Sequence, residues 1–304
     1  MKKKTLLFLA LIFSCANIVT AKTNFFESNI FEGLAADDKV AILMVHFGTS
    51  HNDTRAKTIE ALNQKVKVQY PNIEQREAWT SRLVIGIMAK RGENINNPAE
   101  ALLQLKEDGF THIIIQSSNV IEGVEMESLR RDVLAAKDDF KEIRVGNPLL
   151  YTTHDYQVVV DALREKQPAG SALVLVGHGT YTPATAQYAM VDYVIGDKEY
   201  NDMHIGTIEG YPDYDSMLVR LKRENTKNVL LMPFMFVAGE HAKNDIDQDW
   251  RLSLEQEGYS VSVLLEGLGE MEAVQDLFLE HIDFAIKHKM YDIIEKKAVY
   301  ATQK

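Results

Sequence analysis

The feature that most constrains this chain is a series of apolar runs that each end in a titratable side chain. The run Leu173–Thr180 reads Leu-Val-Leu-Val-Gly-His-Gly-Thr, which is typical of a buried parallel strand with His178 at its end. Two later runs lead into Glu209 and His241. The intervals between these three residues are 31 and 32 residues, about the length of one strand–helix–strand unit.

Right-handed crossovers would place these strands side by side in one parallel sheet, all pointing the same way. The ends of such strands meet at one edge, so we expect His178, Glu209 and His241 to lie together there. Two imidazoles and a carboxylate, without a thiolate, suit a divalent metal ion that keeps open coordination positions. Gly177 and Gly179 flank His178 and would leave room for a bulky ligand.

Each of these residues also has an ordinary structural explanation. His178 could bond a backbone carbonyl in a loop, and Glu209 could be a helix N-terminal anion or a surface carboxylate. His241 could be a first-turn helix residue, with the neighbouring Glu240 as an equally suitable ligand. We favour the metal site because three titratable strand ends at one-unit spacing would rarely coincide by chance.

The chain also contains an internal repeat. Ile42–Thr49 resembles Leu173–Thr180, and Ile113–Glu125 resembles Val229–His241 in the order of apolar run, polar turn, glycine and titratable group. Apolar runs alternate with amphipathic segments throughout, which predicts an α/β fold with parallel sheets. The expected strands are Val40–Val45, His112–Gln116, the run from Leu173, Met203–Ile208, Val229–Val237 and 260–265.

We therefore expect two similar parallel-sheet α/β units, 38–155 and 156–290, that face each other across a cleft. The second unit would carry the metal site, and 291–304 would be a tail. The lead-in 22–37 would dock on the body through four apolar side chains, Phe25, Phe26, Ile30 and Phe31. Asn97-Pro98 predicts a helix start, because a capping residue precedes a first-turn proline.

Residues 1–21 have the pattern of a secretory signal peptide. Lys2–Lys4 form a basic start, Leu6–Val19 is almost entirely apolar, and Val19-Thr20-Ala21 is a small-residue cleavage site. The apolar run is shorter than a typical membrane span. The alternative is lipid attachment at Cys15, which the bulky Phe13 two residues earlier fits poorly. Both readings predict an exported, periplasmic protein, lipid-anchored in the second case.

Composition narrows the function further. Cys15 is the only cysteine, so cleavage after Ala21 leaves no disulfide and no thiolate chemistry. The net charge of −11 becomes −14 when the three lysines at positions 2–4 are removed, so we expect no nucleic-acid partner. The sequence has no P-loop, no HExxH and no GxSxG motif, and we expect no organic cofactor.

At these residues the chain resembles the anaerobic sirohydrochlorin cobaltochelatases of the CbiK type, which are class II chelatases, over about residues 40–288. The resemblance implies insertion of Co²⁺ into sirohydrochlorin, a step of anaerobic cobalamin synthesis. It also implies metal ligands at His178, Glu209 and His241, the three residues singled out by spacing. The motifs that carry it are Phe47-Gly48-Thr49-Ser50, Asp53-Thr54-Arg55, Thr80-Ser81, Asn97-Pro98, Gly177-His178-Gly179, Glu209-Gly210-Tyr211-Pro212, Met232-Pro233-Phe234, Val237-Ala238-Gly239-Glu240-His241, Asn244-Asp245 and Gly267-Leu268-Gly269-Glu270.

The chain departs from that family at the edge of the expected cleft. His46 stands where the family usually has Ser, and Asn119 where it usually has His. We expect His46 and Asn119 to line the tetrapyrrole site, together with three glycines, Gly177, Gly179 and Gly239. These departures, and export, leave Fe²⁺ and a haem-like ring as alternatives to Co²⁺ and sirohydrochlorin.

In the expected mechanism a flat tetrapyrrole lies in the cleft and the divalent metal is a substrate. His178 and His241 would hold the metal, Glu209 would supply negative charge, and His178 would also accept a ring proton. The rival hypothesis is an exported haem- or metal-binding protein, or a haem dechelatase, with His46 as an additional ligand. Both are compatible with a homo-oligomer.

Overall fold

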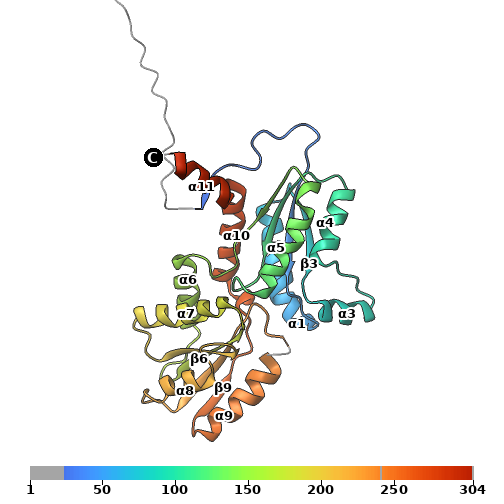
Figure 1. The fold of residues 1–304 in the computed structure, drawn as a ribbon. Coiled ribbons are helices and arrows are strands. Elements are labelled where there is room, and N and C mark those ends of the chain that lie inside the picture. Colours follow the sequence, from blue (N-terminus) through green and yellow to red (C-terminus); the bar gives the residue numbers. More distant parts are fainter. Residues whose placement is uncertain (1–23, 240–241, 303–304) are drawn as a thin grey trace, which may run out of the picture.

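The computed structural model describes residues 24–239 and 242–302 of the chain. These residues contain two four-stranded parallel sheets, ordered β3-β2-β4-β5 and β7-β6-β8-β9 (Figure 1). Because the two orders correspond strand by strand, the sheets repeat one topology, and the expected pair of similar α/β units is confirmed. The strands are β1 Phe25–Glu27, β2 Val40–His46, β3 Glu74–Trp79, β4 His112–Ser117, β5 Glu142–Val145, β6 Ala172–Gly179, β7 Met203–Glu209, β8 Asn228–Phe234, β9 Ser260–Val263 and β10 His288–Met290.

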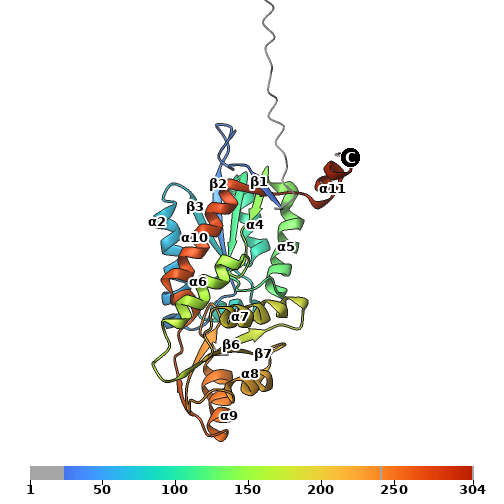
Figure 2. The ribbon, with the colours of Figure 1, turned by 90° about the vertical axis from the view of Figure 1, so that its left-hand side faces the viewer.

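Helices connect the parallel strands and cover the sheets (Figures 1 and 2). The α-helices are α1 Asn52–Arg55, α2 Ala61–Gln69, α3 Arg82–Lys90, α4 Pro98–Glu107, α5 Val124–Ala136, α6 Thr153–Arg164, α7 Ala186–Asp197, α8 Tyr214–Leu221, α9 Arg251–Gln256, α10 Glu272–Lys287 and α11 Ile293–Thr302. Wider π-helical turns occupy Ala56–Glu60 and Ala242–Trp250, and 3-10 turns occupy Lys137–Asp139, Pro183–Thr185 and Leu268–Glu270.

The start of α4 shows how local sequence sets an element boundary. The Asn97 side chain accepts a hydrogen bond from the Glu100 backbone N–H at 3.1 Å, and the Glu100 carboxylate accepts one from the Asn97 N–H at 2.9 Å. Pro98 occupies the first helical position, where its missing N–H has no consequence. The predicted helix start is confirmed.

The core is layered because each sheet is covered on both faces. An inner apolar cluster lies between the sheets and includes Met44 of β2, Leu175 of β6 and Phe278 of α10. Separate clusters fill the outer faces, under α4 and α5 for the first sheet and under α8 and α9 for the second. Strands buried on both faces read as continuous apolar runs, which explains why their positions are visible in the sequence.

The last long helix, α10, crosses from the second half of the chain to the first. It packs against β4 and β5 of the first sheet and against α2 and α6, and Figure 2 shows it beside α2. Helix α6 in turn contacts α7. The two halves are therefore joined by shared helices as well as by the chain between them.

The two ends of the described chain meet in a small antiparallel ribbon of β1 and β10. Phe25 packs edge-to-face on Phe284, with ring centroids 4.9 Å apart, and Phe26 lies against Tyr291 at 4.7 Å. Ile30 is buried, whereas Phe31 is exposed. Three of the four apolar side chains expected to dock the lead-in therefore do so.

No helix in the described part of the chain combines the length and the apolar character that a bilayer crossing requires. The expected signal peptide, residues 1–21 with Cys15, lies outside the described residues.

Candidate functional site

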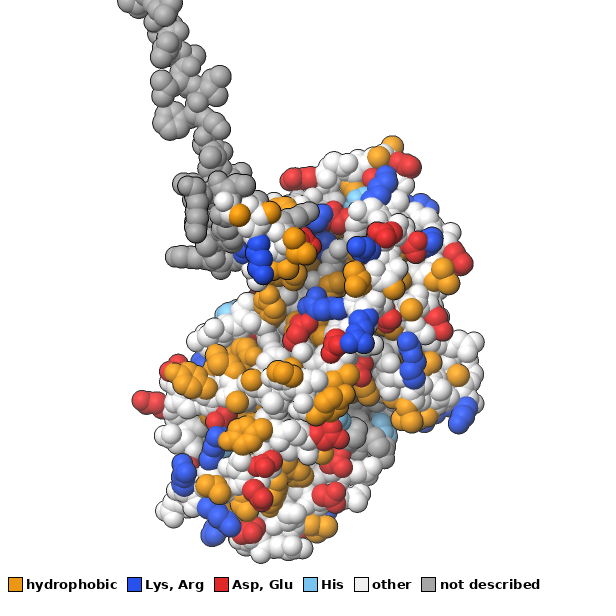
Figure 3. Space-filling model, viewed as in Figure 1, with side chains coloured by type: hydrophobic (Ala, Val, Ile, Leu, Met, Phe, Trp, Pro, Cys, Tyr) orange, Lys and Arg blue, Asp and Glu red, His pale blue; other side chains and the backbone are white. Residues whose placement is uncertain are grey.

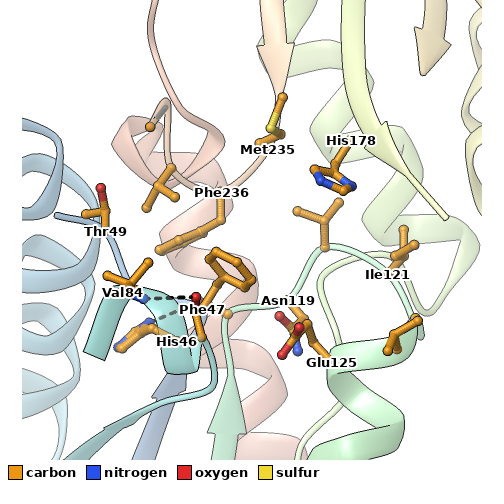
Figure 4. A pocket seen from close by; sticks show the side chains of 18 of the residues that line it. His46, Phe47, Thr49, Val84, Asn119, Ile121, Glu125, His178, Met235 and Phe236 are labelled. Carbon is orange, nitrogen blue, oxygen red and sulfur yellow. Dashed lines mark hydrogen bonds between the residues drawn. The ribbon is translucent and has the colours of Figure 1, made fainter. Parts of the chain in front are cut away.

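A cavity of about 550 Å³ lies between the carboxyl ends of the two sheets (Figure 4). Most of its walls come from the ends of β2, β6, β7 and β8 and the segments that follow β2, β4, β6 and β8, and the helices α3 and α7 contribute further side chains. Ligands of open α/β sheets bind at this edge, and the volume falls within the range of roughly 300–1,000 Å³ typical of small-molecule sites. In the space-filling view of Figure 3, pale blue histidine side chains are visible at the surface near the junction of the two halves of the molecule.

The cavity wall is predominantly apolar. Among the described lining residues there is neither Lys nor Arg, and the carboxylates are those of Glu125 and Glu209. Such walls suit the faces of a flat hydrophobic ring better than a small polar metabolite. The apolar and aromatic lining residues are Phe47, Ile59, Leu83, Val84, Ile87, Val120, Ile121, Val124, Tyr181, Tyr188, Phe234, Met235, Phe236 and Val237.

His178 ends β6 and lines the cavity with its ring partly buried. Its Nδ1 lies 3.2 Å from the carbonyl oxygen of Gly179. Because a carbonyl only accepts hydrogen bonds, this contact places the proton of the neutral imidazole on Nδ1 and the lone pair on Nε2. A neutral ring fixed in one tautomer by a backbone carbonyl is the usual state of a metal-ligating histidine.

Glu209 ends the neighbouring strand β7, with its Cα opposite Gly179 in the sheet register. It is exposed at the cavity edge. The structure thus brings His178 and Glu209 to one cavity, as the strand-end reasoning predicted. His241, the third expected ligand, lies outside the described residues. Within those residues no group of three or more His, Cys, Asp and Glu side chains could hold a metal ion.

Two glycines at the end of β6 allow neighbouring groups to pack closely against this strand. Gly179 has a φ of +86°, and a Cβ there would lie 1.4 Å from the Glu209 carbonyl oxygen, so no other residue fits. A Cβ at Gly177 would lie 2.4 Å from the Tyr188 ring. Gly177 is absent from the described cavity wall, and it makes room for Tyr188, whose hydroxyl accepts a hydrogen bond from the Gly179 N–H.

Gly239 lines the cavity on the side of the second sheet. A Cβ there would meet Thr49 Oγ1 at 3.6 Å, which is an ordinary contact.

His46, at the end of β2, lies at the foot of the cavity and is buried (Figure 4). Its Nδ1 is 2.8 Å from Ser118 Oγ and its Nε2 is 3.1 Å from Asn63 Oδ1. Burial lowers the pKa of the imidazole, an effect that the Glu77 carboxylate and the bond to Asn63 oppose. Both ring nitrogens therefore have protein partners, an arrangement that favours a supporting role over that of an additional metal ligand.

Asn119 and Glu125 lie next to each other on the wall that belongs to the first sheet (Figure 4). Asn119 Nδ2 is buried without a hydrogen-bond partner among the described residues. Glu125 lies in the first turn of α5, where the helix dipole favours a negative charge. This part of the wall can thus offer both a donor and a carboxylate to a ligand.

Sequence reasoning did not select Ser118, Glu125 or the tyrosine Tyr181 as site residues, although all three line the cavity. A signal existed for Glu125, because in the internal repeat it occupies the sequence position that corresponds to His241. Ser118 directly follows β4, so the strand-end rule could have found it. Tyr181 is 85% exposed, and nothing in its local sequence distinguishes it from a surface tyrosine.

Comparison with known proteins agrees with this geometry. A family model described as cobalt chelatase (CbiK) matches residues 40–287. The chain is 34% identical over 256 residues to a sirohydrochlorin cobaltochelatase of Salmonella typhimurium, covering 82% of this chain and 97% of that protein. It is 31% identical over 258 residues to the sirohydrochlorin cobaltochelatase CbiKC of Nitratidesulfovibrio vulgaris, covering 82% and 91%.

The fold also resembles solved structures. SirB from Bacillus subtilis with Fe³⁺ superimposes with a TM-score of 0.58 at 14% identity, over 82% of this chain and 96% of that one. At that level of identity the similarity concerns the fold alone.

Proposed function

The chain belongs to the cobalt chelatase (CbiK) family, and from that membership we propose that it inserts Co²⁺ into sirohydrochlorin. The observation that carries the proposal is the extent of the family match, residues 40–287. This range contains both parallel sheets, every described residue that lines the cavity, and α10.

The tetrapyrrole would lie in the cavity between the apolar side chains of the two halves. Phe47 of the first half and Met235 and Phe236 of the second point toward the same space (Figure 4). Contact with these side chains removes the apolar faces of the ring from water, which stabilises about 25 cal/mol per Å² buried. The carboxylates on the ring's edge would stay at the solvent side.

Metal delivery would take place from the wall of the second sheet. With Nδ1–H bonded to the Gly179 carbonyl, the neutral form of His178 would hold the metal through Nε2, and Glu209 would add a carboxylate. His241 would complete the set. A borderline divalent ion such as Co²⁺ accepts imidazole and carboxylate together, and open positions would let ring nitrogens replace its remaining ligands.

Insertion also requires two pyrrole N–H protons to leave. A neutral imidazole can accept a proton near pH 7, and His178 is the candidate on the side from which the metal arrives. His178 could serve first as a metal ligand and then as a proton acceptor, because the metal would leave the imidazole as it enters the ring.

A second candidate function has one specific observation in its favour. Sirohydrochlorin carries many carboxylates, yet the described cavity wall has Glu125 and Glu209 and no Lys or Arg. An apolar, acidic wall fits a less carboxylated ring such as haem. The alternative proposal is therefore a haem-binding protein, or a dechelatase that acts on haem with iron as the metal.

One experiment separates these proposals. The purified chain is incubated with sirohydrochlorin and Co²⁺ and, separately, with haem, and absorbance spectra are followed. Conversion to the cobalt form supports the chelatase. A stable haem spectrum without any insertion supports a carrier, and loss of iron from haem supports a dechelatase.

A pair of variants connects that activity to the site. His178→Ala should lower the insertion rate by at least about 10²-fold, the lower range of acid–base contributions, with an unchanged far-UV circular dichroism spectrum. His154→Ala is the matched control, since His154 lies exposed in α6. A wild-type rate in His178→Ala would remove this residue from the mechanism.

We also propose that the chain is exported, on the basis of the signal-peptide pattern in residues 1–21. Mass spectrometry of the protein from its native membrane, periplasmic and cytoplasmic fractions tests this. A mature chain that begins at Lys22 indicates cleavage after Ala21. A lipid adduct that disappears in Cys15→Ser indicates the anchored form, and an intact Met1 in the cytoplasm contradicts export.

A further inference from the structure

A line of hydrogen-bonded side chains runs from the cavity into the first sheet. Ser118 Oγ lies 2.8 Å from His46 Nδ1, and His46 Nε2 lies 3.1 Å from Asn63 Oδ1. The Asn63 amide group donates in turn to Glu77 Oε2. The line therefore reads Ser118, His46, Asn63, Glu77, and its first two members line the cavity.

The far end of this line fixes its direction. Glu77 is a carboxylate that accepts from Asn63 at one oxygen and from Trp79 Nε1 at the other, at 2.7 Å. Asn63 must then present its carbonyl oxygen to His46, so the proton of the neutral imidazole sits on Nε2. Nδ1 carries the lone pair and accepts the Ser118 hydroxyl proton. The oxygen of Ser118 keeps its own lone pairs for a donor in the cavity.

Burial protects this line of hydrogen bonds, and a nearby charge supports proton uptake. His46 is 1% and Ser118 3% exposed, so bulk water does not compete for their hydrogen bonds. Burial lowers the pKa of His46 and thus favours the neutral ring, the form that can accept a proton. Glu77 is the charged group whose field reaches it, and a carboxylate one amide away would stabilise the imidazolium once it forms. The Phe236 ring stacks on the imidazole with centroids 6.0 Å apart and holds its orientation.

We propose that Ser118 and His46 form a proton acceptor on the first-sheet wall of the cavity. The Ser118 oxygen takes a proton from a ring nitrogen while its own proton passes to His46 Nδ1. One N–H bond of the ring breaks, one N–H bond forms on His46, and the ring nitrogen keeps the electron pair with which it binds the metal. After the product leaves, the proton returns through Ser118 to water in the cavity.

The position of this pair complements that of His178. His178 and His46 lie on opposite walls of the cavity (Figure 4). Glu209 ends β7 of the second sheet, whereas Ser118 follows β4 of the first. A divalent ion that binds the ring from one side makes its N–H groups more acidic, so even a weak base suffices on the other side. The inference rests on the proposed chelatase function, to which it adds a second acceptor for the second proton.

Three variants test the catalytic role. In His46→Gln the new amide can accept a hydrogen bond from Ser118 and donate one to Asn63, but it cannot take up a proton. This variant should therefore lower kcat by about 10- to 100-fold with little change in KM. Ser118→Ala should have a similar effect, and Ser118→Thr, which restores the hydroxyl, should recover most of the loss. Ser128→Ala, an exposed serine of α5, is the matched control.

The dependence of the rate on buffer concentration shows whether Ser118 and His46 accept a proton or only shape the cavity wall. In Ser118→Ala the rate should rise with the concentration of the basic form of the buffer, because solvent base replaces the missing acceptor. The wild-type rate should not. Unchanged kcat in both His46→Gln and Ser118→Ala, or a change confined to KM, would overturn the proposal.

A second measurement does not depend on turnover and so separates this inference from the proposed function. In protein labelled with ¹⁵N-histidine, NMR should show His46 with Nε2 protonated and Nδ1 bearing the lone pair, the signals being assigned by their loss in His46→Gln. Ser118→Ala should shift the Nδ1 resonance toward that of a free imidazole nitrogen. A protonated Nδ1, or no shift in Ser118→Ala, overturns the relay even if the protein proves to be a haem carrier.

Discussion

At the scale of single residues, the site depends on a glycine without a side chain as much as on the side chains of His178 and Glu209. His178 and Glu209 share a cavity because Gly179 lets the end of β6 pass against the Glu209 carbonyl. A positive φ and a forbidden Cβ at one position make that glycine a structural requirement of the site.

We therefore expect Gly179→Ala to destabilise the fold by about 3 kcal/mol or more, because strain and a clash with backbone combine. Urea unfolding measures the loss. Gly196→Ala is the control: Gly196 lies exposed in α7 with open space at its Cβ, and alanine there should stabilise by roughly 0.5–1 kcal/mol. Equal stability of Gly179→Ala and wild type would contradict the geometry.

A second residue-scale prediction concerns pH. Burial, and then the charge of Arg220, lower the pKa of His204 in β7 to about 4 from 6.5. The unfolded chain takes up a proton below pH 6.5 that the folded chain refuses, so stability should fall as pH drops from about 6.5 to about 4. The full effect is on the order of 3 kcal/mol.

His204→Gln should flatten that part of the pH–stability curve, measured by urea unfolding at several pH values. His154→Gln, an exposed histidine, should leave the curve unchanged. The same slope in His204→Gln and wild type would show that this residue is not its source.

The sequence predicted the site at the residues where chemistry and strand ends coincide. His178 and Glu209 were predicted because each stands at the end of an apolar run that forms a buried strand. His46 was also predicted to line the site, but its hydrogen bonds to Ser118 and Asn63 were not predicted, because these partners lie far from it in the chain. Which histidine nitrogen faces which partner is a tertiary property, and local pattern does not contain it.

At the scale of elements, Arg144 in β5 is the main link between the chain's two ends and its body. It is 5% exposed, and its Nη1 donates to the carbonyls of Ala285 at 3.0 Å and Ile286 at 2.8 Å and also to Ser28. These bonds satisfy backbone acceptors at the last turn of α10, where a positive charge is also favourable.

Arg144→Met should cost about 2–4 kcal/mol of stability, because several buried carbonyls lose a charged donor together. Hydrogen exchange should report faster opening of the β1–β10 ribbon, and urea unfolding should report the free-energy loss. Arg131→Met is the control, since the Arg131–Glu127 pair is exposed on α5 and should contribute less than about 0.5 kcal/mol. Unaltered exchange in the ribbon would rule out the link.

Most elements were predictable because buried strands and amphipathic helices carry strong periodic signals. β5 was missed: it has four residues, Glu-Ile-Arg-Val, and an edge strand with charged residues has no continuous apolar run. The strands β1 and β10 were missed because three residues are too few to show a periodic pattern. The pattern of α10 showed which face is buried, but a hydrophobic face alone does not specify the sheet that it covers.

At the scale of the whole molecule, the two halves share one interior. The inner apolar cluster includes residues of both sheets and of α10, and α10 from the end of the chain packs on the first sheet. Neither half buries its inner face without the other, so we expect a single cooperative unfolding transition.

The chain's two tryptophans allow a direct test, because Trp79 lies in the first half and Trp250 in the second. In Trp250→Phe and in Trp79→Phe, the remaining tryptophan reports one half by fluorescence while far-UV circular dichroism reports both. The two signals should give the same urea midpoint in each variant. Separate midpoints would mean that the halves unfold independently.

The meeting of the two ends has a consequence for how the molecule can be rebuilt. The Tyr291 N–H donates to the Asn24 carbonyl at 2.8 Å, so the described body is almost a closed loop of chain. A short peptide joining these positions, with new termini opened in the exposed turn 168–170, would give a circular permutant that keeps the native contacts. A tag or surface linkage attached at Asn24 or at Tyr291 would hold the described body by the same pole.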